Sequence, residues 1–157
     1  LSPEALNSAR RSVLCWLATA DAAGQPNVSP KEIFAAIDPT HLVIAHIASP
    51  ASVRNIRVNP RVCASFIDIF VQKGFKVLGT ARHVGRSDAG FARWAAPLEA
   101  MAGPRFPIHS VIVVEVDAVE PIVRDCAAKK AGGAKQSGSS DPTQRGSGQF
   151  DPLNGNI

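Results

Sequence analysis

The sequence predicts a mainly β fold, a closed or nearly closed antiparallel barrel of about six strands with short helices. Apolar runs of strand length are separated by turn-forming residues, and only two or three segments carry helix start and stop signals. No regular strand–helix alternation runs through the chain, and no G-x-G-x-x-G motif follows a strand, which argues against a doubly wound dinucleotide-binding fold. The 157 residues, 45% hydrophobic and 19% charged, fit one globular domain.

The first part of the chain is predicted to form a helix and three strands. The run Ser2–Glu4 supplies an N-cap, a proline and an acidic first turn, so a helix is expected to reach about Arg11. The next strand, Ser12–Ala20, is apolar on both faces and is expected to be well buried. After a turn rich in Gly and Pro, Asn27–Ile37 is expected to return as its hairpin partner, and His41–Ile47 forms the third strand.

The later part of the chain is predicted to hold two more strands, a longer helix and a final strand: Arg61–Asp68, Phe75–Val84, Ser87–Ala102 and Ile108–Val116. Pro97 is expected to kink or split this helix, and Val119–Val123 could extend the last strand. From about Ala127 the chain is rich in Lys, Gly, Ser, Gln and Asp. Residues 1–126 are therefore assigned to the barrel domain and residues 127–157 to a low-complexity tail.

A short helix after the third strand is the first candidate for a binding site. Ser49 is a good N-cap, Pro50 suits the first helical position, and Asn59–Pro60 is a stop signal. The helix start would offer free N–H groups, the hydroxyls of Ser49 and Ser52, and the cation of Arg54. These groups suit a phosphate, although an ordinary capped helix would look the same.

Two strand segments add further candidate residues. Asn27, Ser29 and Lys31 share one face of the second strand, which either faces solvent or meets a ligand. Pro30 cannot join a ladder hydrogen bond there, and the ammonium of Lys31, in an otherwise apolar segment, would favour an anionic partner. Gly74 and Gly79 allow a flat ligand or another chain to approach the backbone, but a plain turn and a barrel bend explain them equally well.

Composition excludes or disfavours several classes of protein. The net charge is +4 and the basic residues are scattered, and with few aromatic residues nucleic-acid binding is unlikely. No apolar run approaches the length of a membrane span. The three cysteines are far apart and read as reduced thiols, so a cytoplasmic location is expected. The four histidines show no metal-ligand spacing, and no metal site is expected.

Four segments in this order resemble the pyridoxamine 5'-phosphate oxidase-like superfamily, the FMN-binding split β-barrel proteins. They are Gly24–Lys31, Leu42–Val62, Gly74–Ala81 and Val116–Pro121, and the resemblance covers about residues 8 to 123. It implies a split antiparallel six-stranded β-barrel and a homodimer with two FMN sites at the subunit interface. Where many members carry a cationic pair at the helix start, this chain has Ala51 and Ser52, so another cation must compensate.

The resemblance also implies a cofactor site drawn from four segments. The second strand would line the flavin, the end of the third strand would meet the ring, the helix start would hold the phosphate, and the link before the fifth strand would approach from the other chain. In this sequence the corresponding residues are Ser29, Pro30, Lys31, Ala45, His46, Ser49, Ser52, Asn55, Gln72, Lys73 and Gly74.

The function expected from these observations is that of an FMN-dependent oxidoreductase of unassigned substrate, with NAD(P)H as a possible electron donor. Lys31 and Lys73 are candidates to stabilise the anionic reduced flavin. Three alternatives remain: a non-enzymatic FMN-binding electron carrier, a flavin-storage or stress protein, or a protein of the same fold that uses haem or a deazaflavin. With haem, His46 or His83 would be the first ligands to test. The tail shows no substrate-binding segment of the vitamin B6 enzyme, so that activity is not expected.

Overall fold

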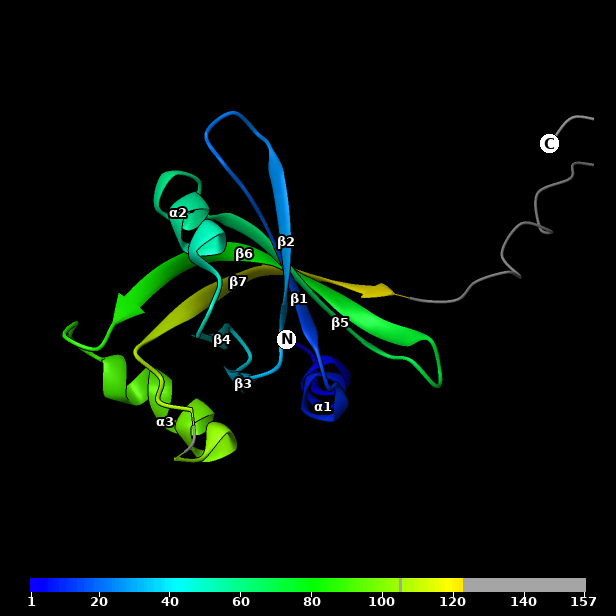
Figure 1. Cartoon of the computed structure of the whole chain (residues 1–157). Coiled ribbons are helices and arrows are strands. Elements are labelled where there is room, and N and C mark those ends of the chain that lie inside the picture. The colour runs from blue at the N-terminus through cyan, green and yellow to red at the C-terminus, as the bar shows by residue number, and fades with distance from the viewer. Residues whose placement is uncertain (105, 123–157) are drawn as a thin grey trace, which may run out of the picture. The chain divides into compact units, whose positions relative to one another are not determined.

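The computed structural model describes residues 1–104 and 106–122, which contain three helices and seven strands (Figure 1). The predicted tail and Cys126 lie outside these residues. The elements are α1 (Pro3–Arg11), β1 (Cys15–Ala20), β2 (Pro26–Lys31), β3 (Phe34–Asp38), β4 (His41–His46), α2 (Pro50–Val58), β5 (Arg61–Asp68), β6 (Lys73–Gly85), α3 (Phe91–Ala102) and β7 (Ser110–Ile122).

All seven strands belong to one antiparallel sheet in the order β2-β1-β5-β6-β7-β4-β3. The mainly β class is confirmed, but the number of strands is seven, not six. The segment Asn27–Ile37, expected as one strand, changes partner halfway: β2 pairs with β1, whereas β3 pairs with β4. The Ala45 N–H bonds to the Ile33 carbonyl at 2.9 Å, which holds this crossing segment against the end of β4.

The inner face of the curved sheet encloses the main hydrophobic core. Its fully buried members include Leu17, Ile44, Phe66 and Ile112, one from each of four strands. Helices α1 and α2 lie at opposite ends of the barrel (Figure 1), and both add buried residues, Ala9 from α1 and Ile56 from α2. The edge strands β2 and β3 pair with one neighbour each and the other five strands with two, and side chains fill the interior.

A second core lies on the outer face of β4, β6 and β7, where α3 covers the sheet. Trp94 and Leu98 of α3 pack against Val43, Val84 and Val113. The indole of Trp94 also lies 5.1 Å from the His41 ring, and the guanidinium groups of Arg82 and Arg93 lie over it at 5.4 and 4.5 Å. We call this half of the outer surface the covered face.

Within residues 1–104 and 106–122, no helix covers the other half of the outer surface, over β1, β2 and β5. We call it the open face; its exposed apolar side chains are Val13, Trp16, Val28, Ile67, Ile69, Phe70 and Val71. The expectation that β1 is buried on both faces is therefore wrong: Cys15 and Leu17 point inward and are buried, but Trp16 points outward and is 43% exposed. Alternate side chains of a strand face opposite sides, and no helix of the described residues covers the outer side here.

Helix boundaries follow most of the predicted signals. Helix α2 has the predicted start and stop, and the Ser2 hydroxyl caps α1 by accepting from the Ala5 N–H at 3.2 Å. Helix α3 begins at Phe91, later than predicted, because Asp88 accepts from the Gly85 N–H at 2.7 Å and holds a turn instead. Within the described residues no helix is long and apolar enough to cross a membrane.

Candidate functional site

A cavity of about 410 Å³ lies at the split in the barrel, between the ends of β2 and β4. This volume is in the range of small-molecule sites. Five of the residues predicted from sequence line it: Ser29, Pro30, Lys31, Ala45 and Ser49. The rest of the lining is mostly apolar and comes from segments that sequence reasoning did not single out, namely Glu32, Ile33, Ile47, Ala48 and Phe106.

Lys31, the last residue of β2, is the most unusual residue of this cavity. It is only 5% exposed, and its ammonium donates a hydrogen bond to the Ser49 hydroxyl. Among the described residues Lys31 forms no ion pair. Burial lowers the pKa of this ammonium, because the charged form loses hydration. A buried cation without a carboxylate is costly, and an anionic ligand in the cavity would compensate the charge.

The start of α2 lies beside Lys31 and has no side-chain cap. Ser49 was predicted to cap this helix, but its hydroxyl accepts from Lys31 and makes no capping bond. Pro50 occupies the first helical turn and has no N–H, so the free donors are the next amides of that turn. An uncapped helix start next to a buried ammonium provides two kinds of attraction for one anion.

Ser52 and Asn55, predicted to hold the phosphate, take part in a polar network in this structure. The fully buried Ser52 hydroxyl lies 3.0 Å from the Ser29 hydroxyl and accepts from the Asn27 amide at 3.3 Å. The Thr19 hydroxyl accepts from the amides of Asn27 and Asn55 at 3.2 and 3.1 Å. These bonds join α2 to the β1–β2 hairpin, so both residues have a structural role here, and their contact with a phosphate stays a prediction.

His46 lies at the end of β4, next to the cavity but not in its lining. Its Nδ1 atom is buried and has no hydrogen-bond partner among the described residues. The ring of His83, from β6, stands edge-on to it with centroids 5.9 Å apart. Burial is the first cause that lowers the pKa of each imidazole; His83 and Lys31 add to the effect at His46, and Arg57 does so at His83.

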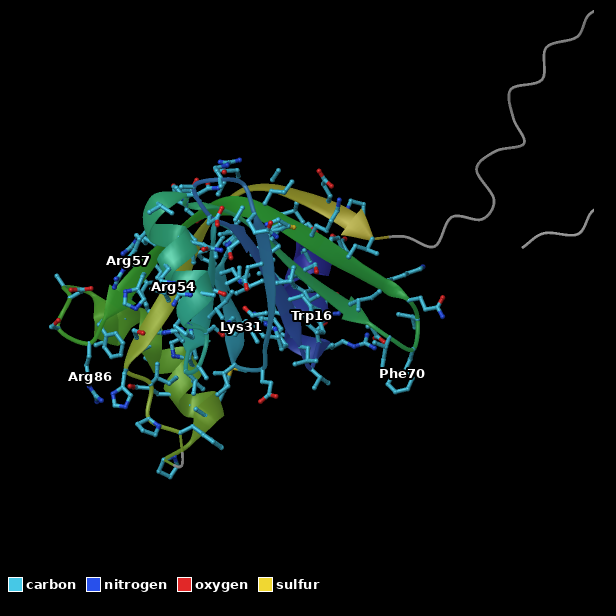
Figure 2. All side chains as sticks on the ribbon, turned by 45° about the horizontal axis from the view of Figure 1, so that its top comes forward. Trp16, Lys31, Arg54, Arg57, Phe70 and Arg86 are labelled. Carbon is cyan, nitrogen blue, oxygen red and sulfur yellow. The ribbon has the colours of Figure 1, made fainter. Side chains whose placement is uncertain are left out.

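The fourth predicted segment, Gln72–Gly74, does not lie at this cavity. Lys73 and Gly74 line a separate cavity of about 360 Å³ beside α1, together with Glu4 and Arg11. In Figure 2, Lys31 lies in the middle of the molecule and Phe70, on the same hairpin as this segment, at the far right. Gly74 allows close packing within the sheet, because a Cβ there would collide with the Phe66 carbonyl. One chain therefore does not bring all the predicted residues together.

Phe106 and Ile47 show what sequence reasoning missed in the site. Both side chains line the cavity, and Ile47 is more than half exposed. Phe106 follows Gly103–Pro104, a break after a helix, and an aromatic residue just after such a break is a usable sequence signal. Its place beside β2 depends on tertiary folding, which no local pattern reveals.

The chain matches the family model of pyridoxamine 5'-phosphate oxidase over residues 1–122. It belongs to the pyridoxamine 5'-phosphate oxidase family. This match covers the whole described barrel and confirms the resemblance seen in the sequence. No curated protein sequence matches the chain.

Solved structures with this fold differ in what they bind. An FMN-binding protein from Syntrophomonas wolfei is 16% identical, with a TM-score of 0.63 over 77% of this chain and 88% of that one. An F420 reductase is 26% identical, with a TM-score of 0.60, and the match covers 76% of this chain and 98% of that one. The haem-storage protein HutZ from Vibrio cholerae is 24% identical, with a TM-score of 0.59, and the match covers 76% of this chain and 93% of that one. The first and third likenesses establish the split-barrel fold alone.

Proposed function

We propose that this protein binds FMN in the cavity between β2 and β4 and acts as a flavin-dependent oxidoreductase of unassigned substrate. The observation that carries the proposal is the buried ammonium of Lys31, which has no carboxylate partner among the described residues and lies at the uncapped start of α2. FMN would supply the chemistry of hydride and electron transfer.

The residues of the cavity fit the two parts of such a ligand. Lys31 and the first free amides of α2 suit an anionic group, either the phosphate or the N1–C2 edge of the reduced flavin. Pro30, Ala45, Ile47 and Phe106 offer apolar surface for a flat ring. The ammonium of Lys31 would thus bind the anionic group of the flavin, while the apolar side chains of the cavity would exclude water from the ring.

A second copy of this chain is the proposed partner. The open face includes a groove of about 510 Å³ lined by Val13, Trp16, Ile67 and Phe70, among others. Exposed apolar patches of this kind mark interaction surfaces. In a homodimer the hairpin that carries Gln72–Gly74 could reach the partner's cavity, and Lys73 would then be a second cation for the ligand. NAD(P)H is the proposed electron donor.

The absorption spectrum of the purified full chain tests the proposal. Flavin bands, or their appearance after FMN is added and excess is removed, would support it. A protein that neither retains nor takes up FMN would contradict it. Reduction of the bound flavin by NADH or NADPH, followed by turnover with an acceptor, separates an oxidoreductase from an electron carrier or a flavin-storage protein.

A deazaflavin is a second candidate for the same cavity, and the 26% identity to an F420 reductase favours it over haem. Parallel titrations with FMN and with F420, followed by fluorescence quenching, would show which one binds more tightly. An intense Soret band in the isolated protein would indicate haem instead, and substitution of His46 and His83 would then test the iron ligands.

A further inference from the structure

A group of nitrogen-bearing side chains lies at the end of the barrel, beyond the lining of the FMN cavity. His46 from β4 and His83 from β6 are in ring contact. Helix α2 packs against β6, and the positive charge of its Arg57 helps to lower the pKa of His83. Arg54 precedes Arg57 by three residues on α2, so both lie on one side of that helix. Figure 2 shows Arg54 and Arg57 on the same side of the molecule. We call His46, His83 and Arg57 the histidine–arginine cluster.

The cluster has an excess of positive charge. The charged groups that act on the two histidines are Lys31 from β2, Arg57 from α2 and one carboxylate, Asp88 of the turn after β6. Asp88 already accepts the Gly85 N–H at 2.7 Å. Arg57 forms no ion pair among the described residues. The buried Nδ1 atom of His46 has no partner among the described residues. Together with the nearby positive charge, such a group is suited to bind an anion.

We propose that the histidine–arginine cluster is a second anion site, which binds a phosphate-type oxyanion of a ligand other than the flavin. Arg57 would supply a permanent charge with a forked donor, and the two imidazoles would donate N–H groups when protonated. None of its three residues lines the cavity at the split, so this site is proposed as separate from that cavity.

This arrangement couples anion binding to pH. Without an anion, burial and neighbouring cations keep the imidazoles neutral near pH 7, and the pKa of each is below its ordinary value. A bound oxyanion offsets this repulsion and raises both pKa values. By linkage, the anion must then bind more tightly at low pH, by about tenfold for each pKa unit that it restores.

Histidine resonances of the full chain, followed by NMR through a pH titration, provide the test. Sulfate is the probe, because it stays a dianion from about pH 5 to 8, where histidine titrates. Sulfate is expected to raise the pKa of His46 and of His83 and to bind about tenfold more tightly at the acid end of this range. Sodium chloride at equal ionic strength is the control for screening, and acetate shows whether a carboxylate binds as well.

Matched variants decide between a site and a general charge effect. Arg57→Gln is expected to weaken sulfate binding about tenfold, whereas Arg10→Gln, an exposed arginine of α1, should leave it unchanged. Both arginines are exposed, so neither change should unfold the protein. Equal effects of sulfate and chloride, or equal losses in the two variants, would overturn the proposal.

A repeat titration with FMN-saturated protein separates the two sites. If sulfate still raises both histidine pKa values, the cluster serves a ligand other than the flavin. If FMN abolishes the effect, the cluster belongs to the flavin phosphate and a second site is disproved. If the protein binds no FMN, the titration of the free protein still decides whether the anion site exists, and only the proposed oxidoreductase fails.

Discussion

The covered face and the open face are two halves of the same sheet surface, and each carries one tryptophan. On the covered face, Trp94 of α3 is 6% exposed and lies beneath the guanidinium groups of two arginines. On the open face, Trp16 is 43% exposed and Phe70 is 91% exposed. The first half is covered by a helix of its own chain, whereas the second half exposes large apolar side chains and has no cover among the described residues.

The two halves differ in how their apolar side chains can be buried. Burying an aromatic side chain contributes roughly 2–3 kcal/mol, and the covered face gains this within one chain. The open face would gain it only against another surface. The cavity proposed to bind FMN lies where the halves meet, with Pro30 from β2 on one side and Ala45 from β4 on the other. A second copy on the open face would therefore affect the site as well as stability.

The largest effect is expected from Trp94→Ala, on the covered face. This change removes a buried indole from a packed core and should lower the free energy of unfolding by about 3–5 kcal/mol. Chemical denaturation followed by far-UV circular dichroism measures it. Trp16→Ala is the matched control and should lower the free energy of unfolding of the monomer much less. Equal losses would show that the two faces do not differ as described.

The next effect concerns the open face. Trp16→Glu or Phe70→Glu should raise the dissociation constant of the proposed homodimer by about 10- to 100-fold, since each change loses an apolar contact and buries a charge. Sedimentation velocity over a range of concentrations reports the change in mass. Val58→Glu, on an exposed apolar residue of α2 outside this face, is the control. A wild-type protein that is monomeric at every concentration would rule out the dimer.

At the boundary of the halves, Lys31→Met tests the cavity. Loss of a buried charged donor should weaken FMN binding by about 10- to 100-fold. The free energy of unfolding should not fall, because the variant no longer buries an unpaired ammonium. Fluorescence titration and thermal unfolding measure the two effects. A less stable variant that still binds FMN normally would show that Lys31 is a structural residue.

A smaller effect is expected from Ser52→Ala, within the network that joins α2 to the β1–β2 hairpin. Removing the hydroxyl leaves Asn27 and Ser29 with fewer partners and should cost about 1–2 kcal/mol of unfolding free energy. Affinities for FMN and riboflavin should then fall by the same factor. A loss of FMN affinity without a loss of riboflavin affinity would instead indicate that Ser52 contacts the phosphate, as predicted from the sequence.

The smallest effect is the pH dependence of stability. Folding lowers the pKa of His46 and His83 below the ordinary value of 6.5. The unfolded chain therefore binds more protons near this pH, so the free energy of unfolding should decrease as the pH falls from above 6.5 through the lowered values. Denaturant midpoints at several pH values test this. In the double variant His46→Asn and His83→Asn the decrease should be smaller.

Much of the fold could be predicted from local patterns. The stop at Asn59–Pro60 and the proline at position 50 correctly bounded α2, and the Ser2 cap correctly placed the start of α1. Turn residues separated most strands at the right places. The division of Asn27–Ile37 into β2 and β3 was not predictable in this way, because it depends on which neighbour each half pairs with.

Within the candidate site, five of the residues predicted from the sequence line one cavity, but several hydrogen-bond partners were not predicted. Lys31 was expected either to face solvent or to meet an anion; its ammonium is buried and forms no ion pair among the described residues, and contact with an anion stays a prediction. Ser49 was expected to cap α2, yet its hydroxyl accepts from Lys31. Ser52 and Asn55 have the chemistry of phosphate ligands, but Thr19 and Asn27 from a distant hairpin take up their bonds. A hydrogen bond depends on where two atoms meet in space, and sequence spacing gives only one of the two positions.

The sequence by itself determined the mainly β class, the helix limits that proline and capping residues impose, and the family to which the chain belongs, because these depend on local chemistry and on the order of motifs. Only the tertiary structure decided which tryptophan is covered, which serine is buried, and that Lys31 faces an open cavity while Gln72–Gly74 lies elsewhere. The reason is physical: burial and ligand access depend on surfaces that long-range packing brings together, and the free energy of a charge or an indole changes with that environment.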